Sequence, residues 1–227
     1  LLMPARESRA AGAGAALRAD VKRVTCPVVL IDRLTQCGWC DAVGFDNYLG
    51  GRLAAQYLLE GGHKRIGIVT GDVAESSAAD RRRGFVDAIE QAGERFDPAL
   101  CVSGDYRFDG GYHAADRIID GGATAVFCCN DVMALGFRQR MAERGLHVTE
   151  DMQVIGYDNI LRRFGLGLRM TTVEQSVVDL AAAGWGMLGS RIDAVVRGDG
   201  DSGACRPWLA SPQVKVLTPK LVQAACA

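Results

Sequence analysis

A strand–helix–strand pattern in the middle of the chain most constrains its fold. The run Thr124–Cys129 is largely apolar and predicts a buried strand, and Val132–Arg144 places apolar residues at roughly helical spacing. Asp131 is a candidate N-cap for that helix, and Gly145 is a candidate C-cap. A second apolar run, Met152–Gly156, predicts the next strand. The pattern therefore indicates an α/β fold.

Polar side chains follow both strands of this unit. Asn130 and Asp131 come directly after the first strand, and Asp158 comes soon after the second. Ligands of open parallel sheets bind at the carboxyl ends of the strands, so we expect these three side chains to share one ligand-binding rim. The structural alternative is that Asn130 and Asp131 only cap the helix and that Asp158 only opens a turn.

The rest of the chain continues the alternation of strands and helices. Further strands are predicted at residues 27–32, 42–45, 65–70, 100–102 and 213–217, and further helices at residues 15–24, 49–60, 81–92, 110–120 and 176–196. A polar loop is expected at residues 71–80 and another loop at residues 160–170. Strands that alternate with helices of about a dozen residues predict parallel sheets with crossover helices.

The composition is that of a soluble globular protein. The chain has 227 residues, of which 48% are hydrophobic and 23% charged, so it is long enough for one large domain or two lobes. A net charge of −1 gives no whole-chain reason to expect nucleic-acid binding. No apolar run approaches the roughly 20 residues that span a bilayer, and the first residues do not resemble a signal peptide. We therefore expect a cytoplasmic protein that does not bind membranes.

Eight cysteines raise the question of disulfides or redox activity. Cys37 and Cys40 have redox-motif spacing, but a strand follows them, so no helix N-terminus lowers a thiol pKa there. Cys128 and Cys129 end a predicted buried strand, where free cysteine packs as a small apolar residue. No second Cys/His pair lies at zinc-site spacing. We expect reduced cysteines and no metal site.

The sequence offers no residues for catalysis. It contains no phosphate-binding loop, no dinucleotide-binding glycine motif after a strand, and no nucleophile elbow. The histidines, His63, His113 and His147, do not form a pattern with a carboxylate and a nucleophile. We therefore expect no enzymatic activity, no catalytic residue and no cofactor.

Six short motifs, in one order along the chain, carry a family resemblance. They are Val28–Arg33, Gly61–Gly67, Arg81–Phe85, Asn130–Ala134, Val154–Asp158 and Thr171–Gln175. Each motif alone is weak, but the ordered series resembles the ligand-binding core of the LacI/GalR family of bacterial transcription regulators. The resemblance implies two similar α/β lobes of the periplasmic-binding-protein-like type I fold, with a small ligand in the cleft. The expected lobes are residues 1–64 with 176–203, and residues 65–173 with 204–227.

The resemblance also implies a set of ligand contacts. Arg81, Asn130 and Asp158 match polar ligand contacts of the family, Tyr106 matches an aromatic contact, and Gln175 matches a polar residue where the chain crosses between lobes. A guanidinium donates and a carboxylate accepts paired hydrogen bonds, which suits the vicinal hydroxyls of a sugar. An aromatic ring packs on the apolar face of a pyranose or a base. The expected effector is a sugar or a related polyol.

Departures from the family pattern limit this resemblance. The helix-turn-helix headpiece is not found, nor are the strand, helix, strand and helix that precede the position of Leu1, so we expect an N-terminally truncated core with an incomplete first lobe. Arg169 and Met170 replace a proline-leucine pair. The implied function is effector sensing in a homodimeric regulator that binds operator DNA only through the headpiece. The alternative is a periplasmic sugar-binding protein of a transport system, and the Gly61–Gly67 and Arg81–Phe85 motifs favour the regulator.

Overall fold

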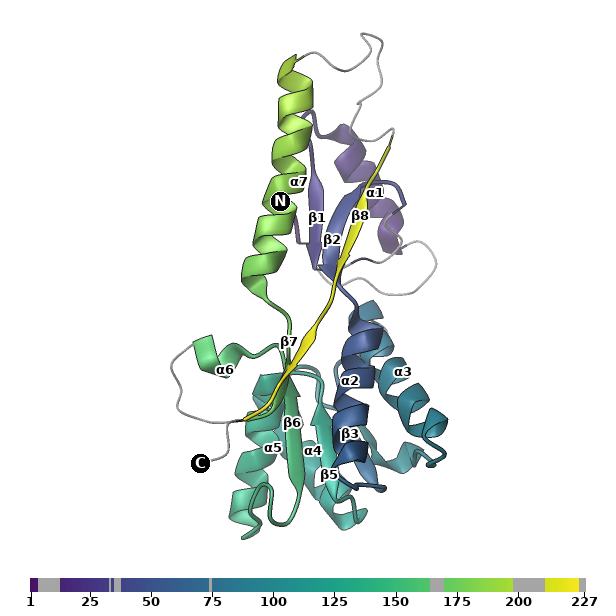
Figure 1. Ribbon diagram of the computed structural model, residues 1–227, viewed down its shortest axis with the longest axis vertical. Helices are drawn as coiled ribbons and strands as arrows, with labels where there is room; N and C mark the ends of the chain where they lie inside the picture. The colour runs from purple at the N-terminus through teal and green to yellow at the C-terminus, as the bar shows by residue number, and fades with distance from the viewer. Residues whose placement is uncertain are drawn as a thin grey trace. The chain divides into compact units, whose positions relative to one another are not determined.

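The computed structural model describes residues 1–3, 13–32, 34, 38–73, 75–163, 170–197 and 211–224. The chain forms two compact units, which are described separately below (Figure 1). Unit 1 comprises Leu1–Asp46, Ala74–Ser76 and Ser176–Thr218, and unit 2 comprises Asn47–Val73, Ser77–Gln175 and Pro219–Ala227. The fold class is α/β, as predicted, with sheets in which most neighbouring strands are parallel.

Unit 2 is built on a six-stranded sheet in the order β4-β3-β5-β6-β7-β9. Its strands are β3 (Ile66–Thr70), β4 (Cys101–Ser103), β5 (Ala125–Cys128), β6 (Gln153–Tyr157), β7 (Thr172–Glu174) and β9 (Lys220–Val222). Its helices are α2 (Asn47–Glu60), α3 (Ser76–Gln91), the 3-10 turn η1 (Pro98–Leu100), α4 (Phe108–Asp120), α5 (Asp131–Glu143) and α6 (Ile160–Arg163). All neighbouring strands are parallel except the antiparallel pair β7 and β9.

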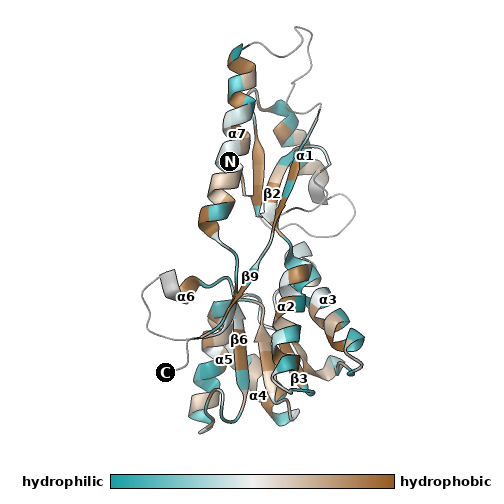
Figure 2. Ribbon diagram, in the orientation of Figure 1, coloured by the Kyte–Doolittle hydropathy of each residue, from teal (hydrophilic) through white to brown (hydrophobic). Residues whose placement is uncertain are grey.

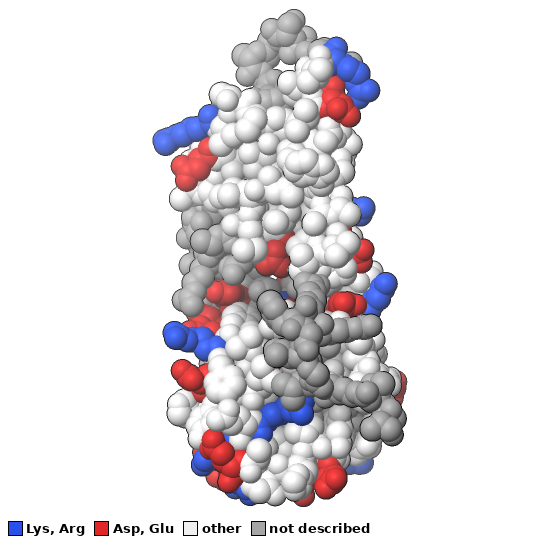
Figure 3. All heavy atoms as spheres, turned by 90° about the vertical axis from the view of Figure 1, so that its left-hand side faces the viewer, with Lys and Arg blue, Asp and Glu red and all other residues white. Residues whose placement is uncertain are grey.

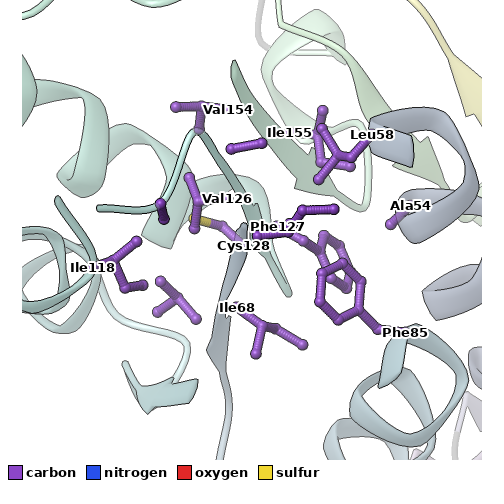
Figure 4. Packing of buried hydrophobic residues seen from close by; sticks show 14 of the residues in the cluster. Ala54, Leu58, Ile68, Phe85, Ile118, Val126, Phe127, Cys128, Val154 and Ile155 are labelled. Atoms are coloured by element: carbon purple, nitrogen blue, oxygen red, sulfur yellow. The ribbon is translucent and has the colours of Figure 1, made fainter. Parts of the chain in front are cut away.

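The core of unit 2 lies on both faces of this sheet. Strands β3 and β5 are buried at every position, as expected for parallel strands covered by helices on both sides. Alternate side chains of a strand point to opposite faces. Phe127 of β5 stacks on Phe85 of α3 with ring centroids 5.3 Å apart, while Ile118 of α4 lies on the other side (Figure 4). Side chains of the strands and of the surrounding helices form one hydrophobic cluster, and the ribbon of β3 is coloured as largely hydrophobic in Figure 2.

The N-cap of the helix that follows β5 lies one residue earlier than predicted. Asn130, not Asp131, is the N-cap of α5, and its Oδ1 accepts a hydrogen bond from the Met133 backbone N–H at 2.8 Å. Asp131 is the first helical residue. At the other end Arg144 is the C-cap, and Gly145 follows it with a φ of +72°. Glycine adopts this left-handed conformation without strain, so it ends the helix as its position suggested.

Helix α3 starts at Ser76, so the predicted loop over residues 71–80 is too long. The Ser/Ala-rich start of the helix has no apolar periodicity, which is why the sequence pattern did not show it. Ala78 is nevertheless fully buried, and Asp80 pairs with Arg83 at 3.1 Å, one turn along. As a result Arg81 lies inside the helix and not at its entrance.

Unit 1 has a three-stranded parallel sheet in the order β1-β2-β8. Its elements are α1 (Ala13–Arg23), β1 (Val29–Asp32), β2 (Asp41–Phe45), α7 (Val177–Arg197) and β8 (Val214–Leu217). Leu2 adds a single parallel bridge to Leu30 of β1. One face of the sheet packs on α7 through Leu188, and the other face forms a separate small cluster that includes Val21 of α1.

Two elements lie in a different unit from the one expected. Helix α2, assigned from the sequence to the N-terminal lobe, belongs to unit 2 because Ala54, Ala55 and Leu58 are buried in that core. Strand β8, assigned to the C-terminal lobe, pairs with β2 and therefore belongs to unit 1. The short strand β9 was not predicted, and it joins the sheet of unit 2 beside β7.

Some sequence predictions lie outside the described residues. They concern Arg33, Cys37 and residues 164–169 of the loop expected at residues 160–170. Among the cysteines that the structure describes, five are free thiols: Cys26, Cys40, Cys101, Cys128 and Cys129. The helices of the described ranges include none that combines the length and apolarity needed to cross a bilayer.

Candidate functional site

Arg81 is the centre of a polar cluster at the carboxyl ends of the strands of unit 2. Its side chain is 7% exposed, so its charge needs partners. Its Nη1 donates to the Cys129 carbonyl at 2.6 Å, and its Nε donates to Asn47 Oδ1 at 2.8 Å. Its Cζ lies 3.7 Å from the centre of the Tyr157 ring, a cation–π contact. Burial alone would lower the pKa of Arg81, but Tyr157 and then Asp158 raise it above its usual value.

Asp158 and Gln175 complete this cluster. Nη2 of Arg81 lies 3.8 Å from Asp158 Oδ1 and donates to Gln175 Oε1 at 3.4 Å. The Gln175 amide in turn donates to Asn47 Oδ1 at 3.1 Å and to the Tyr157 hydroxyl at 3.2 Å. Of the five residues predicted for the site, Arg81, Asp158 and Gln175 are thus brought together directly.

Asn47 and Tyr157 belong to the cluster but were missed in the sequence. Asn47 is the first residue of α2 and follows β2, a strand of the sheet of unit 1, so the strand-end rule applied to the sheet of unit 2 does not place it beside Arg81. Tyr157 ends a strand, and nothing in the pattern shows that its hydroxyl turns toward the rim. Gly50 of α2 makes room for it, because a Cβ at that position would collide with the Tyr157 hydroxyl.

Asn130 and Tyr106 form a second pair beside the cluster. Asn130 Nδ2 donates to the Tyr106 carbonyl at 3.1 Å, while its Oδ1 caps α5. The Asn130 side chain therefore caps the helix, which was the structural alternative to ligand binding. It also holds the loop after β4. Asp105 and Tyr106 both adopt left-handed φ values, +51° and +58°. The Tyr106 ring centre lies 6.0 Å from Arg81 Cζ, so the predicted aromatic neighbour is near the guanidinium.

Asp131 is not an exposed member of the rim, contrary to expectation. Its side chain is fully buried and accepts hydrogen bonds from Thr172 Oγ1 and from the Ile160 backbone N–H, each at 2.7 Å. Desolvation raises the pKa of this carboxyl despite these bonds. Asp131 thereby fixes the turn that holds Asp158 and Asn159 at positive φ, +93° and +54°. It positions the site without being accessible to a ligand.

The buried thiols Cys40, Cys128 and Cys129 are not reactive groups. Burial raises the pKa of Cys129 to about 12 and that of Cys40, in unit 1, to about 11, so both are protonated at neutral pH. The pKa of Cys128 is also raised well above the usual value by burial. A thiol that stays protonated is a poor nucleophile and a poor metal ligand. The described residues contain no group of three or more His, Cys, Asp or Glu side chains that could hold a metal ion.

Comparison with known proteins identifies the family. Residues 55–210 match the family model described as a periplasmic binding protein-like domain. The HTH-type transcriptional repressor PurR of Pasteurella multocida (strain Pm70) is 38% identical over 169 residues, which are 74% of this chain and 51% of the repressor. PurR of Haemophilus influenzae (strain PittEE) is 36% identical over 170 residues, covering 74% and 50%. The chain thus spans about half the length of these curated relatives.

Solved structures of regulators share the fold. The complex of the transcriptional regulator CelR with cellobiose has a TM-score of 0.80 at 26% identity, covering 98% of this chain and 64% of that one. A LacI family transcriptional regulator from Enterococcus faecium with bound ribose has a TM-score of 0.78 at 26% identity, covering 95% and 76%. These relatives are regulators, which favours the regulator over the transport-protein alternative. The chain belongs to the family of periplasmic binding protein-like domains, in the form that serves as the ligand-binding core of LacI-type transcription regulators.

Proposed function

We propose that this chain is the effector-sensing core of a transcription regulator and that Arg81 and Asp158 bind a small polyhydroxylated molecule, a sugar or related polyol. One observation carries the proposal. A buried guanidinium, 7% exposed, lies 3.8 Å from a carboxylate that is 31% exposed, at the carboxyl ends of the strands. A charged donor held inside and a charged acceptor at the surface form a polar edge to which hydroxyl groups can bind.

The geometry of the pair suits hydroxyl groups. A separation of 3.8 Å exceeds hydrogen-bond length, so the two groups interact by charge and not by a hydrogen bond. A ligand hydroxyl can accept from the guanidinium and donate to the carboxylate at the same time, and a vicinal hydroxyl can add a second bond. Gln175 keeps the guanidinium in place, and Asn130 holds the Tyr106 loop. The Tyr106 ring provides an apolar face for a sugar ring.

The relatives support the same class of ligand. Two structural neighbours hold cellobiose and ribose. In the proposed mechanism the effector binds one conformation of the core more tightly than another and so changes the affinity for operator DNA. The proposal includes DNA contact through a helix-turn-helix region, as the relatives' names imply, a homodimer, a cytoplasmic location and the absence of catalysis.

Thermal-shift measurements against sugars, polyols and nucleobases test the ligand class, because a ligand that binds only the native state raises its apparent stability. Calorimetry with the best ligand then tests the site. Asp158→Ala should weaken binding by about 2–5 kcal/mol, since it removes the carboxylate that faces the Arg81 charge and that accepts hydrogen bonds from the ligand hydroxyls.

A matched control removes a carboxylate of the same kind elsewhere in unit 2. Asp120 of α4 pairs with Arg144 at 2.8 Å and its side chain is 65% exposed. Asp120→Ala should leave the affinity unchanged. Unchanged affinity with Asp158→Ala would show that the site is wrong, whereas stabilisation by nucleobases alone would show that the ligand class is wrong.

A further inference from the structure

Unit 2 has a cavity beside the amino end of β6, whereas the Arg81 cluster lies at the carboxyl ends of the strands. Its volume is about 250 Å³. Gln153, the first residue of β6, lines it, whereas Tyr157, the last residue of the same strand, stacks on Arg81. The other lining residues used below are Tyr57, Leu58, Glu60, His63 and Gln223. The cavity is therefore separate from the proposed effector site.

The end of α2 shapes this cavity. The helix stops at Glu60, and Gly62 turns the chain back with a φ of +81°. The His63 backbone N–H then donates to the Leu58 carbonyl at 3.1 Å, which brings the imidazole beside the last turn of the helix. The C-terminal end of a helix has a partial negative charge, which attracts cations. Glu60 adds a full negative charge at the same place.

The imidazole of His63 presents an acceptor. Its Nδ1 lies 3.0 Å from Thr124 Oγ1, and that hydroxyl donates to the Arg65 carbonyl at 3.4 Å. In the tautomer that leaves this hydroxyl hydrogen on the Arg65 carbonyl, Nδ1–H donates to Thr124 and Nε2 carries the lone pair. Burial lowers the pKa of His63, which keeps the ring neutral at pH 7. The cavity thus has an imidazole acceptor next to a carboxylate.

No cation neutralises this carboxylate among the residues that the structure describes. The basic side chains that follow His63 are engaged elsewhere: Lys64 pairs with Glu94 at 3.0 Å, and Arg65 pairs with Asp97 at 2.9 Å. A metal ion would need more ligands than the cavity offers, because Glu60 and His63 are the only two strong metal ligands in its lining. The amides of Gln153 and Gln223 supply further hydrogen-bonding groups.

We propose that this cavity binds a small organic cation with N–H donors, of the guanidinium or primary ammonium class. Glu60 supplies the charge, and His63 Nε2 and the two glutamine side chains accept hydrogen bonds. Tyr57 and Leu58 contact the apolar part of the ligand. The volume is below the roughly 300–1,000 Å³ of drug-sized pockets, so the ligand is small.

An NMR titration of the 227-residue chain tests the proposal with two probes of nearly equal shape. Methylguanidinium should produce saturable shifts of the Gly61 and Gln153 amide signals. N-methylurea, which is uncharged, should bind about two- to fivefold more weakly than methylguanidinium, as expected for the loss of one exposed charge pair.

Two carboxylate variants complete the test. Glu60→Gln keeps the size of the side chain and should weaken methylguanidinium binding about two- to fivefold. Glu94→Gln removes a carboxylate that pairs with Lys64 outside the cavity and should leave binding unchanged. Equal affinity for both probes, an unchanged affinity in Glu60→Gln, or no saturable shift would each overturn the proposal.

Discussion

The two units of this chain bury their apolar surface to very different extents. In unit 2, β3, β5 and almost all of β6 are buried, and helices cover the sheet. In unit 1, β8 is exposed along most of its length, and α7, with 21 residues, buries only Gly184 and Leu188. Several turns of α7 are nevertheless coloured as hydrophobic in Figure 2. Since burial of apolar surface is the dominant stabilising term in folding, unit 2 should be far more stable than unit 1.

The contrast is clearest on α7. Val178, Trp185 and Val196 are 75%, 68% and 80% exposed. A helix that is apolar around most of its circumference is normally buried, and a contiguous exposed apolar patch is typical of an interaction surface. The part of unit 1 visible in Figure 3 has few charged side chains. The lesson is that a long regular helix contributes little stability unless its apolar face is covered.

Unit 1 compensates in part with a buried ion pair. Arg191 of α7 donates to both carboxylate oxygens of Asp41 in β2, at 2.7 and 2.9 Å. The Gln213 backbone N–H donates to the same carboxylate at 2.7 Å, and Arg191 also reaches the Ser211 carbonyl at 2.6 Å. One carboxylate thus ties the helix and the start of β8 to the sheet.

The largest expected effect is a difference in hydrogen exchange between the units. Amides of β5 in unit 2 should exchange at least about 100-fold more slowly than amides of β1 in unit 1. This ratio corresponds to a difference of about 2.7 kcal/mol in the free energy of opening. Native-state exchange followed by mass spectrometry measures both strands in one sample. Equal protection of the two strands in a soluble monomer would refute the comparison.

Removal of an aromatic ring should affect the two units very differently. Phe127 is fully buried and stacks on Phe85, so Phe127→Ala should destabilise unit 2 by about 3–5 kcal/mol. Trp185→Ala removes a larger but 68% exposed side chain from unit 1 and should change stability by about 0.5 kcal/mol or less. Urea unfolding followed by far-UV circular dichroism gives both values. A cost above about 2 kcal/mol for Trp185→Ala would mean that α7 is covered in solution.

Arginine substitutions compare ion pairs in the two units. Arg191→Ala leaves Asp41, whose side chain is 1% exposed, without its cation, and should destabilise unit 1 by about 2–4 kcal/mol. Arg144→Ala in unit 2 breaks pairs with Asp116 and Asp120, which are 44% and 65% exposed, and should cost about 1 kcal/mol or less. Chemical unfolding measures the two losses. Equal costs would show that the Asp41 site is hydrated.

The fold was predictable from sequence where local pattern and burial agree. The apolar runs at β3, β5 and β6 fit only the buried strands of a parallel sheet. A polar residue that directly follows such a strand is predicted to lie at the rim formed by the carboxyl ends of the strands. The start of α3 was not predictable, because its Ser/Ala sequence lacks periodicity. The place of α2 in unit 2 was also hidden, since either unit could have received its apolar face.

The site shows the same limit. Its individual members Arg81 and Asp158 were identified, but their partners are far away in sequence: Asn47 lies 34 residues before Arg81, and Gln175 lies 94 residues after it. Asp131 was misplaced because a carboxylate after a strand is usually exposed, and only the structure shows Thr172 and Ile160 enclosing it. Long-range hydrogen bonds leave no periodic trace in a sequence.

The smallest expected effect is a pH dependence confined to unit 2, which contains all three histidines of the chain. Burial lowers the pKa of His63 below its ordinary 6.5, so the unfolded chain takes up a proton there before the folded chain does. Unit 2 should therefore lose stability as the pH falls from about 7 through the lowered pKa of the folded state. His63→Gln should flatten this slope in urea unfolding at pH 7.5, 6.5 and 5.5, values chosen to span roughly the histidine range.

The raised pKa of Asp131 acts in the opposite direction, but equally in the unsubstituted chain and in the His63→Gln variant, so the difference between the two slopes isolates His63. Unit 1 is the internal control, and an equal slope in unit 1, or the same slope in His63→Gln, would contradict the assignment.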